Sequence, residues 1–337
     1  MIFFDTTKTG DAGHRSGLTR VSARLRAGLG SLATGAAWNA IAPGPTDWFL
    51  TSELFSEEER PGFTAFLAAH RCRLAAIFHD AIPLKHPHIT WPQSVARHPG
   101  YMKLLSRFDR VWTVSQASRE ELLGFWHWQG VDQTPPVDVL ALGADFDGMA
   151  RLTSRLPSPA CPRLLSVGIV EPRKNQALLL EVCEQLWTEG LVFELHLVGR
   201  VNPHFGGPIA TRIKQLRRTR RTSLHFHEAA DDATLAELYA TARATVFPTI
   251  AEGCGLPLLE SLWRGVPCVC SDLPVLLENA AGGGCLPVGT NDPTAWKDAL
   301  RRIITDDALA FRLTREATSR PLPTWQAASA TLATALR

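Results

Sequence analysis

Short apolar runs that alternate with helical patterns are the feature of this sequence that most limits its possible folds. Between these runs, apolar residues recur at helical spacing, as at 17–29 and at 118–126, where a serine begins the pattern. Strands that alternate with helices form parallel α/β sheets. We therefore predict two doubly wound sheets in series. The predicted strands are 2–4, 74–78, 111–114 and 137–142, followed by 164–167, 193–198, 224–226, 244–247 and 268–270.

A segment rich in proline, serine and glycine separates the two series of strands at residues 147–163. At about 150 residues per domain, a chain of 337 residues is expected to hold roughly two domains. We predict an N-terminal Rossmann-like domain over 1–155 and a C-terminal Rossmann-like domain over 156–320. Residues 321–337 are predicted to form a C-terminal helix, for which packing back on the N-terminal domain is one option.

The charge balance and the apolar pattern exclude several classes of protein. Lys and Arg number 35 and Asp and Glu number 33, a net charge of +2. A nucleic-acid-binding chain usually has a larger basic excess, so no nucleic-acid partner is expected. No apolar run approaches the roughly 18 residues of a membrane-spanning helix, and the first residues do not resemble a secretory signal. These features predict a cytoplasmic location.

The seven cysteines are scattered and form no Cys-x-x-Cys motif. In a chain of this size they are expected to be reduced and mostly buried. Cys268 and Cys270, two apart on a predicted strand, are expected to point to opposite faces and so not to share a metal ion. His86 and His88 flank a proline and have no third ligand, which favours a solvated loop. The sequence therefore predicts no bound metal.

The most informative segment is Glu-Gly-Cys-Gly-Leu-Pro-Leu-Leu-Glu at residues 252–260. Its glycines let a ligand approach the backbone closely, and Pro257 suits the first position of a helix that Gly265 closes. The N-terminus of such a helix favours an anion, for example a diphosphate. Glu252 precedes the helix and Glu260 lies inside it. Both carboxylates can therefore border one ligand, and a carboxylate can accept two hydroxyls of a sugar or a ribose.

A second segment, Val-Gly-Ile-Val-Glu-Pro-Arg-Lys-Asn at residues 167–175, ends a predicted strand with glycine. It then puts Arg173 and Lys174 at the predicted start of a helix. Cations there oppose the helix dipole, so they require an anionic partner. We interpret the pair as a site for negatively charged groups of a ligand.

Two segments of the first domain follow predicted strands in the same way. His79 and Asp80 lie at the carboxyl end of a buried strand, and ligands bind at that end of open α/β sheets. The segment Gly-His-Arg-Ser-Gly-Leu-Thr-Arg at 13–20 follows the first strand and opens a helix.

Together these segments resemble the retaining glycosyltransferases of the group 1 type, classified as family 4, whose hallmark is two glutamates separated by seven residues. The resemblance implies two Rossmann-like domains facing across a cleft, the arrangement called GT-B. It implies that Glu260 binds the donor ribose and Glu252 the hexose hydroxyls. It also implies that Arg173 and Lys174 stabilise the leaving diphosphate, with His79 beside the transferred sugar. By the same resemblance the other donor-binding residues are Gly17, Arg20, Gly168, Gly253, Cys254, Gly255 and Leu256.

The implied reaction is transfer of a hexose from a nucleotide diphosphate sugar to a hydroxyl of a glycan or lipid-linked acceptor in bacterial polysaccharide assembly, with the anomeric configuration retained. Fixed cations can meet the charge on the leaving phosphates, so no metal or other cofactor is expected. The Glu-Pro-Arg-Lys-Asn variant is most similar to mannosyltransferases, which makes GDP-mannose the first candidate donor. UDP- and dTDP-sugars stay open. The alternatives are a sugar-nucleotide 2-epimerase of the same fold and a noncatalytic partner subunit.

Basic residues outnumber acidic ones near the beginning of the chain. The first thirty residues contain Lys8, Arg15, Arg20, Arg24 and Arg26 against Asp5 and Asp11. A cationic helix there can touch anionic lipid headgroups. Peripheral contact with the cytoplasmic face of the inner membrane is therefore a further expectation. The basic run at 214–221 is interpreted as a solvated helix end.

Overall fold

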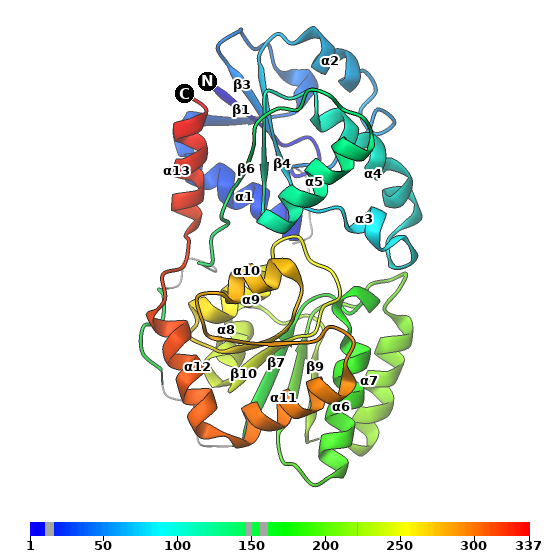
Figure 1. Cartoon of the computed structure of the whole chain (residues 1–337), viewed down its shortest axis with the longest axis vertical. Coiled ribbons are helices and arrows are strands. Elements are labelled where there is room, and N and C mark those ends of the chain that lie inside the picture. Colours follow the sequence, from blue (N-terminus) through cyan, green and yellow to red (C-terminus); the bar gives the residue numbers. More distant parts are fainter. Residues whose placement is uncertain (11–16, 146–149, 156–160, 221) are drawn as a thin grey trace. The chain divides into compact units, whose positions relative to one another are not determined.

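The structure, a computed structural model of the whole chain, describes all residues except 11–16, 146–149, 156–160 and 221. The chain forms two compact units (Figure 1): unit 1 comprises Met1–Gly143 and Pro323–Arg337, and unit 2 comprises Ala144–Leu322. Each unit is built on a six-stranded sheet of parallel strands. The prediction of two Rossmann-like domains is confirmed.

The unit 1 sheet has the strand order β2-β1-β3-β4-β5-β6. The four predicted strands form, and two more, β2 and β3, join them. Strand β2 lacks an apolar run, whereas β3 has the buried run Trp-Phe-Leu, which the sequence reasoning missed. The strands are β1 (Ile2–Asp5), β2 (Ala33–Ala36), β3 (Trp48–Thr51), β4 (Arg73–Phe78), β5 (Arg110–Thr113) and β6 (Val137–Val139). The helices are α1 (Gly17–Leu29), α2 (Phe63–Ala69), α3 (Ile82–Lys85), α4 (Pro92–Leu105), α5 (Gln116–Trp128) and α13 (Trp325–Ala335), with short 3-10 turns at Gly30–Leu32, Trp38–Ala40 and Pro87–Ile89.

Helix α5 shows how the local sequence sets an element boundary. The helix begins at Gln116, two residues before its predicted start at Ser118, because the capping serine is Ser115, whose hydroxyl accepts a hydrogen bond from the Ser118 amide at 3.0 Å. A serine at this position satisfies one of the amides that a helix start leaves without a partner. The hydroxyl of Ser118 in turn donates to the carbonyl of His79 at 2.8 Å, so this helix start supports the loop after β4.

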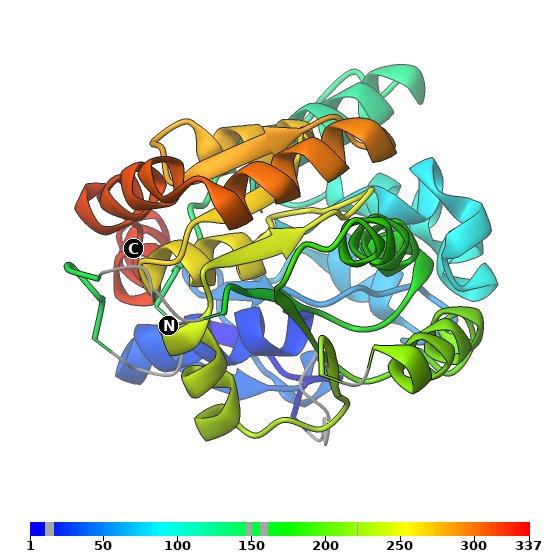
Figure 2. The ribbon, with the colours of Figure 1, turned by 90° about the horizontal axis from the view of Figure 1, so that it is seen from below.

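The C-terminal helix α13 packs against α1 within unit 1. The Ser329 hydroxyl donates to the carbonyl of Leu25 at 3.3 Å, and a Cβ added at Gly28 would lie 2.2 Å from the Ser329 oxygen. Only glycine therefore allows the two helices to approach so closely at this point. As a result the two ends of the chain lie near each other in unit 1 (Figures 1 and 2).

The unit 2 sheet has the order β12-β11-β10-β7-β8-β9. All five predicted strands are present, and the sixth, β12, was not predicted because a proline interrupts it at the sheet edge. The strands are β7 (Arg163–Val167), β8 (Glu194–Val198), β9 (Leu224–His227), β10 (Ala244–Phe247), β11 (Cys268–Ser271) and β12 (Cys285–Val288). The helices are α6 (Gln176–Thr188), α7 (Gly207–Thr219), α8 (Asp232–Thr241), α9 (Leu256–Trp263), α10 (Pro274–Ala280), α11 (Pro293–Thr305) and α12 (Asp307–Ser319), and Pro172–Lys174 forms a 3-10 turn.

Helices cover both faces of this sheet. The largest apolar cluster of unit 2 joins one face to α6, α7, α11 and α12, and a smaller cluster joins the other face to α8. Figure 2 shows the orange α11 and α12 on one side of the sheet and the yellow-green α8 on the other. Burial on both faces explains why most strands here are continuous apolar runs.

The boundary between the units lies earlier than predicted. Residues 144–155, predicted to belong to the first domain, belong to unit 2. The physical reason is hydrogen bonding: the Leu152 amide donates to the Trp263 carbonyl at 3.2 Å, and Arg151 donates to the Ala317 carbonyl at 3.0 Å. Residues 323–337 belong to unit 1.

The cysteines are free thiols, and five of the seven are buried. The expectation that Cys268 and Cys270 point to opposite faces is wrong, because residues two apart on a strand share a face. Cys270 interacts with the thiols of both Cys268 and Cys285, which is the register neighbour of Cys268 on β12. In the described part of the chain no helix is both long enough and apolar enough to cross a bilayer.

Candidate active site

The loops that follow β7, β8 and β10 carry the predicted site residues of unit 2. The loops after β7 and β8 touch directly: a Cβ added at Gly199 would lie 2.1 Å from the carbonyl oxygen of Gly168. The β7 and β10 loops are joined as well, because the Ile250 amide donates to the Arg173 carbonyl at 2.9 Å. These contacts bring the 168–175 segment and the 249–255 segment together at the carboxyl edge of the sheet, as expected for an open α/β fold.

The carboxylate of Glu252 is the centre of a compact ionic group. Its Oε1 accepts hydrogen bonds from Lys174 Nζ, from Arg173 Nη1 at 3.2 Å and from Thr249 Oγ1 at 2.8 Å. Arg173 also pairs with Glu171, its Nη2 lying 2.9 Å from Oε1 of that residue. We call these five residues, Glu171, Arg173, Lys174, Thr249 and Glu252, the Glu252 cluster.

The neighbours of the Glu252 cluster hold its side chains in place. The Arg173 guanidinium also donates to the Ala251 carbonyl at 3.0 Å, so this side chain spans both loops. Asn202, from the loop after β8, donates to the second oxygen of Glu171 at 2.9 Å. The ammonium of Lys174 lies 4.9 Å from the centre of the Phe247 ring, a favourable cation–π distance. The cations of the cluster are therefore fixed by contacts on several sides.

Burial and charge act against each other in the cluster. The side chains of Glu252 and Lys174 are 9% and 11% exposed. Burial alone raises the pKa of Glu252, but Lys174 and Arg173 outweigh it and hold that pKa below the ordinary glutamate value. Burial, with Arg173 second, lowers the pKa of Lys174, and Glu252 acts in the opposite direction. The result is an ionised carboxylate between two cations.

The glycine-rich loop leads into α9 through a glycine in the left-handed conformation. Gly255 has φ of +78°, and a Cβ there would lie 2.6 Å from Cδ2 of Leu276. Helix α9 begins at Leu256, so Pro257 is its second residue and not its first as predicted. The helix ends before Gly265, whose φ of +64° allows the Val266 amide to donate back to Ser261 at 2.9 Å.

The two glutamates of the motif occupy different places relative to α9. Glu252 lies in the loop before the helix, whereas Glu260 lies in its second turn and is 5% exposed. The carbonyl of Cys254, which lies between them, accepts a hydrogen bond from Nδ2 of Asn279 at 2.6 Å. Burial raises the pKa of the Cys254 thiol to about 12, so the thiol is protonated at neutral pH and has no nucleophilic character.

In unit 1 His79 follows β4, as predicted, and is buried. A ring nitrogen of His79, Nε2, lies 2.8 Å from the carbonyl oxygen of Ser52, which follows β3. Burial lowers the pKa of His79, so its imidazole is neutral near pH 7. The neighbouring Asp80 accepts a hydrogen bond from the Ile82 amide at 3.0 Å. A neutral ring oriented by a carbonyl presents its other nitrogen in a defined direction.

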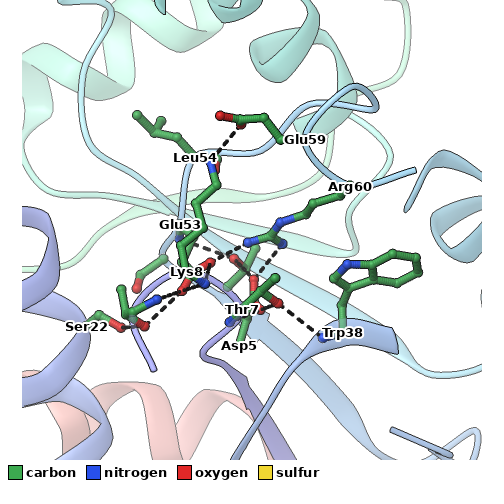
Figure 3. Close-up of polar contacts among 12 residues, drawn as sticks. Asp5, Thr7, Lys8, Ser22, Trp38, Glu53, Leu54, Glu59 and Arg60 are labelled. Carbon is green, nitrogen blue, oxygen red and sulfur yellow. Dashed lines mark hydrogen bonds and ion pairs between the residues drawn. The ribbon is translucent and has the colours of Figure 1, made fainter. Parts of the chain in front are cut away.

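A buried ionic network after β1 and β3 was missed by the sequence reasoning (Figure 3). Arg60 is fully buried, and its guanidinium donates to Asp5 at 2.7 Å and to Glu53. Glu53 also accepts hydrogen bonds from the amides of Lys8 and Thr9, the latter at 2.8 Å. The network therefore holds residues 6–9, the beginning of the loop that leads to α1. Its only sequence signal is that Asp5 directly follows the predicted strand 2–4; Asp5 is the last residue of β1, and Glu53 follows β3, which was not predicted.

The predicted site residues divide between the two units. Unit 2 brings together Arg173, Lys174 and Glu252, and carries Gly168, Gly253, Cys254, Gly255, Leu256 and Glu260 on the same loops and on α9. Unit 1 holds His79, together with Gly17 and Arg20 at the beginning of α1. The preceding residues of the predicted 13–20 loop, residues 13–16, lie outside the described residues.

Comparison with known proteins shows which proteins this chain is similar to. Residues 158–320 match the family model of glycosyl transferases group 1. The serotype-specific mannosyltransferase WbdA of Escherichia coli is 30% identical over 219 residues, which is 60% of this chain and 26% of that protein. The O-antigen chain mannosyltransferase B of Escherichia coli is 31% identical over 260 residues, 72% of this chain and 64% of that protein. The chain thus spans about a quarter of the first relative and under two thirds of the second.

The fold is shared with a solved structure of low sequence identity. Sucrose-phosphate synthase of Thermosynechococcus elongatus is 18% identical and has a TM-score of 0.72, with 99% of this chain and 97% of that chain covered. At this identity the likeness shows the fold alone. It agrees with the two Rossmann-like domains of the GT-B class that the sequence predicts.

Proposed function

This chain belongs to the group 1 glycosyl transferases through residues 158–320, and from that premise we propose that it transfers a hexose from a nucleotide diphosphate sugar to a hydroxyl group. The first candidate donor is GDP-mannose, which the mannosyltransferase names of the two relatives support. The proposed acceptor is a glycan or a lipid-linked glycan of bacterial polysaccharide assembly. The proposed stereochemical outcome is retention at the anomeric carbon.

The observation that carries this proposal is the pair of cations held on Glu252. Lys174 and Arg173 both contact Oε1 of that carboxylate, and both lie on the loop that follows β7. Negative charge develops on the donor diphosphate as the glycosidic bond breaks. Preorganised cations at that point stabilise the transition state without reorganisation. We propose that Arg173 and Lys174 contact the diphosphate when the donor binds. Their positive charges then meet the negative charge that develops on it.

The two glutamates receive different parts of the donor in this proposal. Each described contact of the Glu252 carboxylate uses Oε1, which leaves Oε2 to accept hydroxyls of the hexose. Glu260, one turn inside α9, is assigned to the hydroxyls of the nucleotide ribose. Gly253 and Gly255 allow the diphosphate to approach the start of α9, where helix amides favour an anion.

The proposed reaction proceeds on one face of the sugar. The acceptor oxygen forms its bond to the anomeric carbon on the side that the phosphate leaves, and the acceptor proton passes to a phosphate oxygen. A double displacement would instead need a carboxylate nucleophile beside the anomeric carbon, and no residue of the Glu252 cluster is assigned that role. His79 is proposed to hydrogen-bond the transferred sugar through its neutral ring. The reaction as proposed uses no metal or other cofactor.

The proposed cellular setting is the cytoplasm, with peripheral contact to an anionic membrane. Helix α1 carries Arg20, Arg24 and Arg26, and basic residues near a surface attract anionic headgroups. Co-sedimentation with vesicles of phosphatidylglycerol, but not of phosphatidylcholine, is the expected result. Equal recovery with both vesicles, or with neither, would contradict membrane contact.

The experiment that tests the proposed function measures which sugar nucleotide the protein retains and uses. Purified protein is incubated with radiolabelled GDP-mannose, UDP-glucose or dTDP-rhamnose and filtered, and transfer of label to a glycan acceptor is then followed. Retention of the GDP-linked sugar and acceptor-dependent transfer are expected. Release of nucleotide with an altered free sugar and no need for an acceptor would indicate a 2-epimerase. No retention of any sugar nucleotide would indicate a noncatalytic subunit.

A further inference from the structure

Four ionisable side chains gather on one face of the unit 2 sheet, on strands β8 and β9. They are Glu194, His196, His225 and His227, which we call the histidine cluster. Glu194 and His196 are two apart on β8, and His225 and His227 are two apart on β9. Register pairs His196 with His225 and places His227 beside Val198. All four side chains therefore point to the same face.

The histidine cluster departs from the pattern of the sheet around it. The residues that alternate with it, Leu195, Leu197 and Leu224, are buried in the main apolar core on the opposite face. On its own face, Leu165 and Val198 belong to the apolar cluster under α8. Parallel strands covered on both faces are normally apolar throughout. A polar group at such a position is an inconsistency of the kind that accompanies a functional site.

The geometry of the cluster suits a metal ion. Ligand atoms of Glu194, His196 and His225 all lie within 4.8 Å of one another. His196 Nε2 and Glu194 Oε2 are 3.0 Å apart. Two ligand atoms on a tetrahedral ion with bonds of about 2.0–2.2 Å are about 3.3–3.6 Å apart. The rings of His196 and His225 are stacked, with centres 4.4 Å apart and 21° between their planes, so metal binding requires the partly exposed His225 ring to rotate toward the ion.

The surroundings supply the outer contacts that metal ligands need. Nδ1 of His196 lies 3.1 Å from Nε2 of His227, so the ring of His196 is held by its second nitrogen. Arg163 donates to Oε2 of Glu194 at 2.7 Å. Because Arg163 and Nε2 of His196 both contact Oε2, the other oxygen of Glu194, Oε1, is the one assigned to the ion. Metal-binding histidines are commonly oriented by such a contact on the other ring nitrogen.

We propose that Glu194, His196 and His225 bind one divalent transition-metal ion of the zinc class, with His227 as the residue that positions the ring of His196. Two imidazoles and a carboxylate are ligands that zinc accepts, whereas calcium and magnesium prefer oxygen ligands alone. Three protein ligands leave a fourth position for water. Among the residues that the structure describes, this is the one group of three such side chains close enough to share an ion.

The ion would act as a structural link between two strands. Strand β9 is the outermost strand of the sheet and pairs with β8 along one side. A metal held by β8 and β9 together connects them through side chains as well as through backbone hydrogen bonds. The three ligands lie at the first and third residues of β8 and the second residue of β9, within the strands, whereas the Glu252 cluster lies on the loops after β7 and β10. The proposed link is therefore separate from the proposed transfer reaction.

The test uses Zn²⁺ alone and the full-length protein. Titration calorimetry at pH 7.5 measures the affinity, and the absorption spectrum of the Co²⁺-substituted protein reports the ligands. The variants are His225→Ala and Glu194→Gln, because both side chains are partly exposed and their loss leaves the core intact. His88→Ala is the matched control, since His86 and His88 also have neighbouring rings, 6.2 Å apart. Circular dichroism verifies that each variant is folded.

We expect one Zn²⁺ per chain, a rise of the thermal midpoint with Zn²⁺, and a loss of affinity of at least about tenfold in His225→Ala and in Glu194→Gln. His88→Ala should bind as the unmodified protein does. The proposal is overturned if the unmodified protein does not bind Zn²⁺, or if His225→Ala and Glu194→Gln bind it with unchanged affinity. Loss of binding in His88→Ala would likewise move the site to unit 1 and refute the assignment to β8 and β9.

Discussion

Replacing Arg60 by methionine removes the one cation that the structure places between the buried carboxylates of Asp5 and Glu53. The side chains of Arg60 and Asp5 are 0% exposed and that of Glu53 is 2% exposed. Methionine keeps an unbranched apolar chain that can still pack on Phe55 and Phe63, whose ring centres lie 5.7 and 5.2 Å from the guanidinium. The substitution therefore tests the charge and largely preserves the packing.

The magnitude follows from the burial of the three groups. Removing one partner of a buried ion pair typically costs about 3–5 kcal/mol, because it leaves an uncompensated charge. Because the methionine retains most of the packing, we expect the loss of unfolding free energy to lie at the lower end of this range, about 3 kcal/mol at pH 8. A domain of 150–250 residues loses about 2–4 °C of Tm per kcal/mol, so the unit 1 transition should fall by about 6–12 °C.

The loss should depend on pH in a direction fixed by Glu53. Burial raises the pKa of Glu53, with the charge of Asp5 as the next cause. A carboxyl whose pKa is higher in the folded state stabilises the fold below its unfolded pKa, and this contribution disappears as pH rises through the folded value. Without Arg60 the pKa of Glu53 rises further. The stability difference between Arg60→Met and the unmodified protein should therefore be smaller at pH 5 than at pH 8.

The assay is scanning calorimetry at both pH values, with hydrogen exchange of β1 peptides to assign the transition to unit 1. Arg97→Met is the matched control, because Arg97 pairs with the exposed Glu58 and with Glu59 and should contribute less than about 1 kcal/mol. Adding Glu53→Gln to Arg60→Met should restore part of the loss. Equal effects of the Arg60 and Arg97 substitutions, or a larger loss at pH 5, would refute the reasoning.

Three further predictions concern the donor unit and its chemistry. Chelation with EDTA should leave the rate of transfer unchanged even though it removes any ion from the histidine cluster. If EDTA abolished transfer and a divalent cation restored it, the diphosphate would have to leave with the help of a metal ion. Glu260→Gln should weaken calorimetric binding of the free nucleoside diphosphate, whereas Glu252→Gln should spare that affinity and lower the initial rate; the reverse pattern would exchange the two roles. Gly255→Ala should lower the Tm of unit 2, because φ is +78° and the new Cβ would meet Leu276. The control Gly124→Ala, in open space on α5, should not lower Tm. Similar Tm losses in the two variants would contradict the strain argument.

The sequence predicts the strands best where burial leaves a simple pattern. The β4 run at 74–78 is apolar throughout, and the segment at 193–198 alternates apolar with polar residues; both patterns are typical of strands, and both strands form. Strand β2 has the sequence Ala-Thr-Gly-Ala and gives no such signal. It forms because β1 offers a free edge to pair with, which is a tertiary effect. Strand β12 contains Pro287 and is tolerated because it lies at the sheet edge.

The candidate site is predicted well where one loop carries all the information. Residues 252–260 encode the glycines, the helix start and both glutamates locally, and the structure has each of these features. The ion pair of Glu252 with Lys174 joins residues far apart in the chain, and a single sequence contains no measure of that distance. The same holds for Arg60 and Asp5, and for the approach of His196 to His225. These contacts depend on strand order, which periodicity alone does not determine.

The central claim is that Lys174 and Arg173 form the cationic site for the donor diphosphate, and Lys174→Ala tests it most directly. A charge-assisted hydrogen bond contributes about 1.5–3 kcal/mol, so removing it should slow transfer at least roughly tenfold. The measurement is the initial rate of transfer from the radiolabelled donor, with Lys214→Ala, an exposed lysine of α7, as the control. The account predicts a folded Lys174→Ala protein with a rate at least about tenfold lower and an unchanged control. A folded Lys174→Ala protein that transfers at the unmodified rate would contradict it.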